Sequence, residues 1–164
     1  MKKNQQEVVR WIPFWTIRKF VNEEDYKKGR SYEISKFGGN ALTTEGINEL
    51  WTIIGSAASG TKFDNTHAYL IVGTGTGEES QNDTEATFTN GVKKPMNEGY
   101  PTYGTDRKIT FKSTYDGNSA NQAWNEFGVL NAATGGKLLN RKVSAQGTKT
   151  AGQVWELELE ITLA

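Results

Sequence analysis

The clearest pattern of hydrophobic and polar positions lies near the end of the chain. Over residues 154–163, apolar and polar residues alternate, which places a tryptophan and four aliphatic side chains on one side of the backbone and three glutamates on the other. A period of two residues is typical of a β-strand with one buried face. Residues 108–115 alternate in the same way and carry lysines on their polar side. Because opposite charges on neighbouring strands stabilise a sheet, we expect these two strands to pair.

Three further strands are predicted between residues 67 and 143. Residues 67–73 form an almost continuous apolar run, which is typical of a central strand that is buried on both faces. Residues 126–130 and 138–143 are shorter candidates. The turn-forming residues 131–136 lie between them and favour a hairpin.

One helix is predicted over about residues 44–55. Thr44 can cap its start, and Gly55 can end it. Apolar side chains recur at positions i, i+3, i+4 and i+7, namely at Ile47, Leu50, Trp51 and Ile54. A helix this short must pack its apolar stripe against something to persist.

The remaining segments divide into loops and an N-terminal region of different character. Residues 73–82 and 93–103 are rich in glycine, proline and polar residues and are predicted to be surface loops. The first 39 residues carry aromatic side chains among many charges, which indicates an extended arm that docks on its own domain or on a neighbour. We therefore predict a mainly β, single-domain β-sandwich or jelly-roll-like protein. It has one short helix, a docking arm over residues 1–39 and a β domain over residues 40–164.

The amino-acid composition excludes several kinds of chemical site and several classes of protein. The length of 164 residues suits one domain, and the lack of cysteine excludes disulfides, thiol nucleophiles and cysteine-bound metals. No apolar run of about 18 residues is present, so we expect no membrane-spanning helix. Basic and acidic residues balance at 19 each, which argues against a protein that mainly coats nucleic acid.

Several motifs invite a chemical role, but an ordinary structural role is favoured for each. The glycine-rich segment 73–77 follows a predicted strand, but it lacks the Gly-Lys-Ser/Thr ending of a phosphate-binding loop and precedes two glutamates. The single histidine, His67, has no cysteine or second histidine with which to bind zinc. Four loop carboxylates could gather calcium but match no EF-hand spacing; they are Glu78, Glu79, Asp83 and Glu85.

A hydrolase is another class of function that carboxylates in this sequence could serve. It would need a pair of acids in a cleft, for which Glu126, Glu156 and Glu158 are the candidates. Evenly spaced glutamates on one strand are more typical of a solvated or ion-paired face. We predict no catalytic residue, no metal and no cofactor.

The N-terminal region carries the candidate partner-binding residues, which are Arg10, Trp11, Phe14, Trp15, Arg18 and Phe20. Aromatic and arginine side chains of this kind could stack on nucleic acid or anchor a protein interface. Residues 40–91 carry seven acidic side chains and one lysine, which would repel phosphate. A protein partner is therefore favoured.

The order of several segments resembles a group of small structural proteins from tailed bacteriophages. The matching segments cover most of residues 15–164 and precede a closing alternating strand. They are WTIRKF at 15–20, NALTTEGINEL at 40–50, FDNTHAYLIVG at 63–73, KPMNEGYP at 94–101, AWNEFGVLN at 123–131 and LLNRKV at 138–143.

This resemblance implies a non-enzymatic virion component, a capsid decoration (cement) protein. Such a protein is made in the host cytoplasm, binds the outer surface of the head and clamps neighbouring major capsid subunits. The expected partners are the major capsid protein and copies of the chain itself, for example in a trimer, with no nucleic acid and no membrane. The alternative is a phage tail or fibre protein that contacts the host surface through the loops at residues 73–82 and 93–103.

Overall fold

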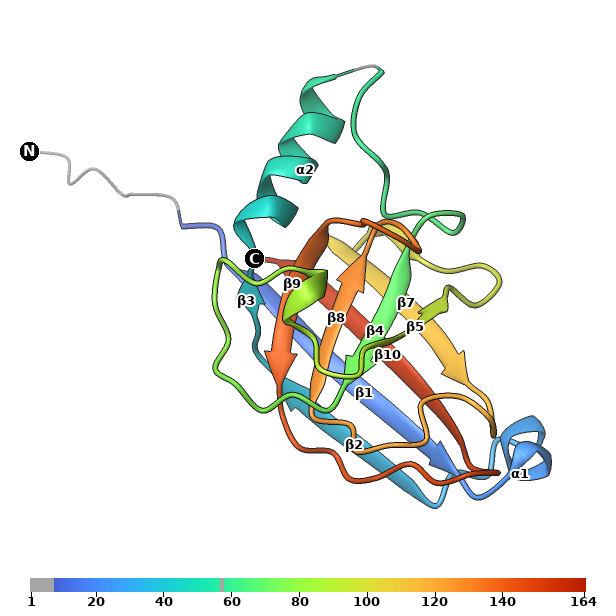
Figure 1. The fold of residues 1–164 in the computed structure, drawn as a ribbon. Helices are drawn as coiled ribbons and strands as arrows, with labels where there is room; N and C mark the ends of the chain where they lie inside the picture. Colours follow the sequence, from blue (N-terminus) through green and yellow to red (C-terminus); the bar gives the residue numbers. More distant parts are fainter. Residues whose placement is uncertain (1–7, 57) are drawn as a thin grey trace, which may run out of the picture.

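The computed structural model describes residues 8–56 and 58–164, which form two antiparallel sheets packed face to face (Figure 1). In order across the sheet, sheet A contains β2 (Glu33–Gly38), β1 (Trp11–Phe20), β10 (Val154–Leu163), β7 (Lys108–Tyr115) and β6 (Thr102–Thr105). Sheet B contains β3 (Ala41–Leu42), β9 (Leu138–Val143), β8 (Glu126–Leu130), β4 (Tyr69–Gly73) and β5 (Val92–Pro95). The predicted β-sandwich is confirmed.

The centre of sheet A is the pair of ten-residue strands β1 and β10, which lie antiparallel and in register along their whole length. The strand β10 also pairs with β7, and this register places Glu158 opposite Lys112. The predicted strands over residues 154–163 and 108–115 are therefore confirmed. So is the predicted match between the acidic face of one strand and the basic face of the other.

The predicted division of the chain into an arm over residues 1–39 and a domain over residues 40–164 is corrected by the position of β1. This strand lies between β2 and β10, so both N-terminal strands belong to sheet A. The inward-facing side chains of Trp15 and Ile17 are fully buried in the core. Burial of these side chains against sheet B stabilises the sandwich, which makes residues 11–38 part of the domain. Residues 1–7 of the predicted arm lie outside the described residues.

The three strands predicted between residues 67 and 143 form the centre of sheet B, whereas its edge strands β3 and β5 were not predicted. The strand β4 begins two residues later than expected, at Tyr69, and lies buried between β8 and β5. The strands β8 and β9 form the predicted hairpin. Residues 93–103, predicted as a loop, instead include most of β5 and the start of β6, each at the edge of a sheet.

Aromatic side chains fill the space between the sheets. Trp124 lies at the centre of this group, with its ring 4.9 Å from the ring of Trp155 and 4.8 Å from that of Tyr115, in edge-to-face geometry. All three side chains are buried. Edge-to-face contacts of this kind add to the free energy gained by burying the rings.

The predicted helix is confirmed as α2 (Thr44–Gly55), although its N-cap is Thr43 rather than Thr44. The Thr43 hydroxyl accepts a hydrogen bond from the Gly46 amide at 3.0 Å. Of the predicted apolar stripe, Leu50 packs against the core, as does Ile53, which was not in the stripe. The helix therefore packs on the sandwich as expected, although the other stripe residues, Ile47, Trp51 and Ile54, are exposed.

A loop over residues 74–91 covers the outer face of sheet B. It includes the short 3-10 helix η1 (Glu85–Thr87), and its Phe88 packs against Ile71 and Leu130 of the sheet. A second short helix, α1 (Glu23–Lys27), lies at the far end of sheet A, where the Tyr26 ring covers Phe20. Among the described residues, no helix is long and apolar enough to cross a membrane.

Candidate partner-binding surface

The structure separates the six predicted partner-binding residues into three groups. Two of them, Trp15 and Phe20, are core residues with exposed fractions of 0% and 4%. The Trp15 ring stacks on Phe37 at 6.2 Å, and the Phe20 ring lies 5.2 Å from that of Tyr26. Because these rings are already covered by the chain itself, the prediction that Trp15 and Phe20 contact a partner is wrong.

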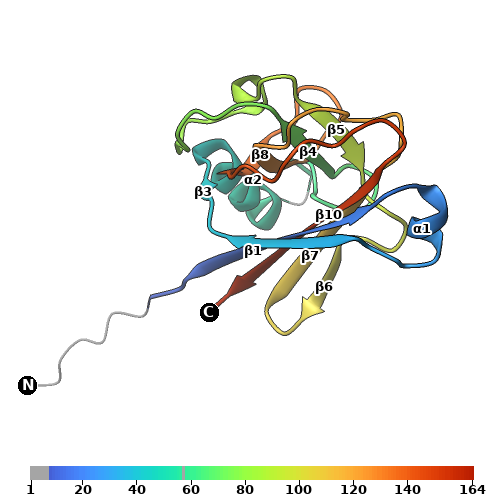
Figure 2. The same ribbon diagram turned by 90° about the horizontal axis from the view of Figure 1, so that it is seen from below.

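Phe14 and Arg18 belong to the outer face of sheet A. Figure 2 shows this sheet as the lower layer, with no described segment beneath it apart from α1 at one end. We call this surface the open face. It consists of the outward side chains of sheet A, which include Ile12, Phe14, Arg18, Ile34, Lys112, Glu156 and Glu158.

Apolar side chains lie on the open face along β1 and β2. Phe14 is 43% exposed, and Ile12 and Ile34 are exposed to a similar extent. The two isoleucines were not predicted as site residues. The signal that could have found Ile12 is the run of apolar residues on both sides of β1, since a strand with one solvated face rarely has this pattern.

A ladder of ion pairs crosses the middle of the open face. The guanidinium of Arg18 lies 3.3 Å from Glu156 and 3.5 Å from Glu158. The ammonium group of Lys112 approaches the same two carboxylates from the other side, at 3.6 Å and 2.9 Å. Two glutamates are thus held between two cations on three neighbouring strands, which explains why repeated glutamates on β10 are tolerated.

The ladder shifts the titration of Lys112. Burial tends to lower the pKa of its ammonium group, but hydrogen bonds to Glu158 and Tyr100 and the charges of Glu156 and Glu158 outweigh burial and raise the pKa above its ordinary value. The Lys112 ammonium also lies 4.8 Å from the centre of the Tyr100 ring. These contacts favour the charged form of Lys112.

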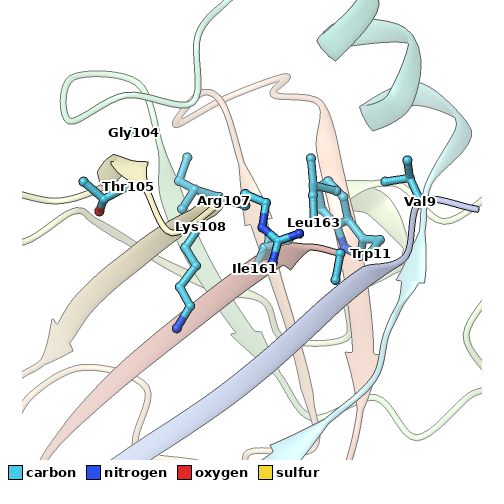
Figure 3. Close-up of a pocket in the computed structure, with 10 residues that line it drawn as sticks. Val9, Trp11, Gly104, Thr105, Arg107, Lys108, Ile161 and Leu163 are labelled. Carbon is cyan, nitrogen blue, oxygen red and sulfur yellow. The ribbon is translucent and has the colours of Figure 1, made fainter.

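Arg10 and Trp11 lie at the end of sheet A where both chain ends meet. The Arg10 amide donates to the Ala164 carbonyl at 2.5 Å, which extends the pairing of β1 and β10. Trp11 and Leu163 line an open groove of about 750 Å³, together with Arg107 and Lys108. Trp11 and Leu163 lie side by side there (Figure 3). The indole nitrogen of Trp11 is buried there without a hydrogen-bond partner in the described part of the chain. This groove lies at the end of the sandwich. It meets the open face at Lys108, which belongs to both.

The loop carboxylates considered as calcium ligands do not converge. Glu79 pairs with Lys142 at 3.0 Å, and Asp83 pairs with Arg141 at 3.1 Å. Glu85 pairs with a third cation, Lys93. Within residues 8–56 and 58–164, no three histidine, aspartate or glutamate side chains gather in a way that could hold a metal ion.

The acids considered for hydrolysis also have other partners. Glu126 is fully buried and accepts two hydrogen bonds from Arg141, at 3.0 Å and 2.8 Å. Glu156 and Glu158 belong to the ladder of the open face. His67, the single histidine, is half-exposed and has its ring nitrogen Nδ1 2.7 Å from Asp64. Each of these acids is therefore neutralised by a neighbouring cation or bound to the histidine ring.

Comparison with known proteins identifies no relative of this chain. No protein-family model, no curated protein and no solved structure matches this chain.

Proposed function

We propose that this chain is a non-enzymatic structural protein of a tailed-phage virion, a decoration protein that binds the outside of the head and clamps neighbouring major capsid subunits. The order of its segments, which resembles that of small phage structural proteins, supports this class of function. The observation that carries the proposal is the open face, a five-stranded surface that the described part of the chain leaves uncovered over most of its area.

The chemistry of the open face suits a protein partner. Half-exposed apolar side chains at Ile12, Phe14 and Ile34 can be buried by contact, and each fully buried side chain of this size contributes about 1.5–3 kcal/mol. Arg18 lies opposite Ile34, and its ion pairs with Glu156 and Glu158 place charged groups next to the apolar side chains, which a partner's polar groups can meet. This surface replaces the predicted docking arm over residues 1–39 as the proposed docking element.

Copy number in purified virions is the first test. We expect many copies per particle at a fixed ratio to the major capsid protein, measured by quantitative mass spectrometry of purified particles. A few copies per particle would instead favour the tail or fibre assignment. Absence from particles would contradict a virion role altogether.

A binding assay with capsids that lack this protein tests the open face directly. The variant Phe14→Asp should fold normally, because its side chain is already partly in water, and should weaken capsid binding by about tenfold or more. Val21→Asp is the matched control, since Val21 is a similarly exposed apolar residue in the turn after β1. Equal binding by the wild type and the Phe14 variant would show that the open face is not the docking surface.

A further inference from the structure

Lys149 has a fully buried side chain, and its ammonium group contacts two neutral oxygens. It donates to the backbone carbonyl of Asp116 at 2.6 Å and to the side-chain oxygen Oδ1 of Asn121 at 2.7 Å. A lysine is rarely buried to this extent unless a carboxylate pairs with it. We propose that Lys149 and Asn121 react with each other to form an intramolecular amide bond. The inference concerns the purified chain and does not rest on the proposed function.

The backbone holds the two residues beside each other. The Lys149 amide donates to the Gln122 carbonyl at 3.0 Å, and the Trp124 amide donates to the Gly147 carbonyl at 2.9 Å. The segment that precedes β8 is thus hydrogen-bonded to the segment that follows β9. Because this pairing fixes the register, Lys149 lies next to Asn121 without a search, and groups held in this way react far faster than free ones.

The side chain of Asn121 is also held in a suitable orientation. Its nitrogen Nδ2 donates to the Gly117 carbonyl at 3.0 Å, which leaves Oδ1 directed at the Lys149 ammonium group. Because Cγ is bonded directly to Oδ1, the lysine nitrogen already lies beside the carbon that it would attack. Asn121 itself is exposed, so a leaving group on its side chain can escape into solvent.

The surroundings of Lys149 favour its reactive form, since only a neutral amine is a nucleophile. Burial lowers the pKa of the Lys149 ammonium group to about 8; the charge of Asp116 opposes this effect, and the charge of Lys94 adds to it. At pH 7, about one molecule in ten then carries the neutral amine. Burial thus supplies a nucleophile at a pH where an ordinary lysine is almost entirely protonated.

The reaction is a substitution at the side-chain amide of Asn121. The neutral Nζ of Lys149 attacks Cγ, so that the Nζ–Cγ bond forms and the Cγ–Nδ2 bond breaks. Nζ loses one proton, Nδ2 gains one, and Nδ2 leaves as ammonia. The step needs no oxidant, reductant or cofactor. Its product joins the segments on either side of the β8–β9 hairpin by a covalent bond.

Mass spectrometry of the purified full chain, incubated at about pH 9, tests the proposal. The intact chain should be lighter than its sequence by one molecule of ammonia. Trypsin cannot cleave after an acylated lysine, so a digest should contain one branched peptide that joins residues 113–137 to residues 143–164. Without the bond, the digest yields residues 113–137, 143–149 and 150–164 as separate peptides. Asn90, which precedes Gly91, can also lose ammonia by closing a ring with its own backbone, but that ring joins no peptides.

Two variants remove the reacting groups, and a third serves as the matched control. Neither Asn121→Ala nor Lys149→Met should yield the branched peptide. Asn118→Ala should yield it as the wild type does, because Asn118 is an exposed asparagine of the same loop, whereas the Lys149 ammonium group bonds Asn121. Circular dichroism of Asn121→Ala, expected to match that of the wild type, shows that its fold is intact.

The rate should also follow the protonation of Lys149. Raising the pH from about 6 to about 7 should speed the cross-linking about tenfold, because the fraction of neutral amine rises tenfold over that range. The rate should level off above about pH 9, where Lys149 is largely neutral. Intact mass recorded over time at each pH measures these rates. A chain that is already fully cross-linked when it is isolated supports the proposal through its branched peptide.

Three results would overturn the proposal. The first is a wild-type chain that yields no branched peptide after prolonged incubation at about pH 9. The second is a branched peptide that persists in Asn121→Ala. The third is a rate of cross-linking that does not change with pH, which would contradict attack by the lysine amine.

Discussion

The outer faces of the two sheets carry the same types of charged side chain in opposite settings. On the open face of sheet A, Arg18 meets Glu156 where both side chains still contact water. On sheet B, Arg141 meets Glu126 with exposed fractions of only 2% and 0%, beneath the loop over residues 74–91. One sheet therefore keeps its ion pairs at the surface, and the other uses them to hold a cover in place.

The loop over sheet B is held in place by three residues that we call the buried clasp, namely Asp83, Glu126 and Arg141. Arg141 bonds both carboxylates and also donates to the backbone carbonyls of Gly77 and Glu78 in the loop. Burial tends to lower the pKa of the Arg141 guanidinium, but the hydrogen bonds and charges of Glu126 and Asp83 outweigh it and raise the pKa. The comparison teaches that the number of ion pairs on a face says little about stability until their burial is known.

The largest expected difference between the two faces comes from removing each arginine. Arg141→Met leaves Glu126 and Asp83 buried without a cation, and it should lower the free energy of unfolding by about 3–5 kcal/mol. Arg18→Met removes two pairs that still contact water, while Lys112 remains beside both glutamates, and it should cost less than about 1 kcal/mol. Chemical denaturation of both variants beside the wild type measures the two losses. Similar losses would show that the clasp and the ladder contribute equally to the free energy of unfolding, and would contradict this comparison of the two faces.

A smaller effect is expected where the loop approaches the clasp. The amides of Gly75 and Thr89 donate to the Glu126 carboxylate at 2.8 Å and 2.7 Å. An added Cβ at Gly75 would lie 2.5 Å from that carboxylate, so Gly75→Ala should destabilise the protein by about 1–3 kcal/mol.

The same variant should also open the loop. Hydrogen exchange of amides over residues 74–91 is expected to speed up in Gly75→Ala. Gly77→Ala is the matched control, because nothing lies within 4 Å of its added Cβ, and it should change stability by less than about 0.5 kcal/mol. If both variants exchange at the wild-type rate, the close approach of the loop to Glu126 does not hold it closed.

This loop shows where sequence reasoning stops. Glycines spaced as in residues 73–77 predict a backbone that can surround an anion, and two of the loop's amides do bind one. The anion is the carboxylate of Glu126, which lies 51 residues away from Gly75 in the sequence. Spacing within the loop carries no information about a partner so distant, so the motif suggested a phosphate loop or a plain turn.

The N-terminal strand shows a second limit. The strands β7 and β10 could be predicted because their alternation is clean, whereas β1 has apolar Ile12 and Phe14 on its outer side and a lysine on its inner side. Lys19 is buried there because its ammonium group donates to Glu33 and to the Gln146 carbonyl, each at 2.6 Å, and lies 4.5 Å from the Trp155 ring. Tertiary contacts of this kind disguise a core strand as a charged aromatic arm.

The sequence predicted where α2 begins and ends, but not which of its sides faces the sandwich. Its boundaries follow from local capping and glycine signals, which act within a few residues. Which half of the apolar stripe is buried depends on where Gly46 meets β9, a contact between residues far apart in the chain. The open face and the outward stripe of α2 could therefore be located only once the two sheets and the helix were placed together.

The smallest expected effect is that of removing the lysine of the ladder, and its dependence on salt and pH distinguishes the surface pairs from the buried ones. Lys112→Met should lower the free energy of unfolding by less than about 1 kcal/mol at low salt, because its pairs with Glu156 and Glu158 remain near water. In about 1 M sodium chloride this loss should shrink, whereas the loss in Arg141→Met should persist, since buried pairs are screened less. Chemical denaturation of each variant and the wild type at both salt concentrations measures these losses.

The pH dependence has a definite sign. The folded-state pKa of Lys112 is raised above its ordinary value of 10.5, so the folded state holds this proton more tightly than the unfolded state. The stabilisation by Lys112 is therefore fully present below pH 10.5 and is lost as the pH rises through the raised pKa. The difference in stability between wild type and Lys112→Met should fall over that range. A difference that stays constant there would mean that the ladder does not favour the charged lysine, and that packing alone accounts for the effect of the substitution.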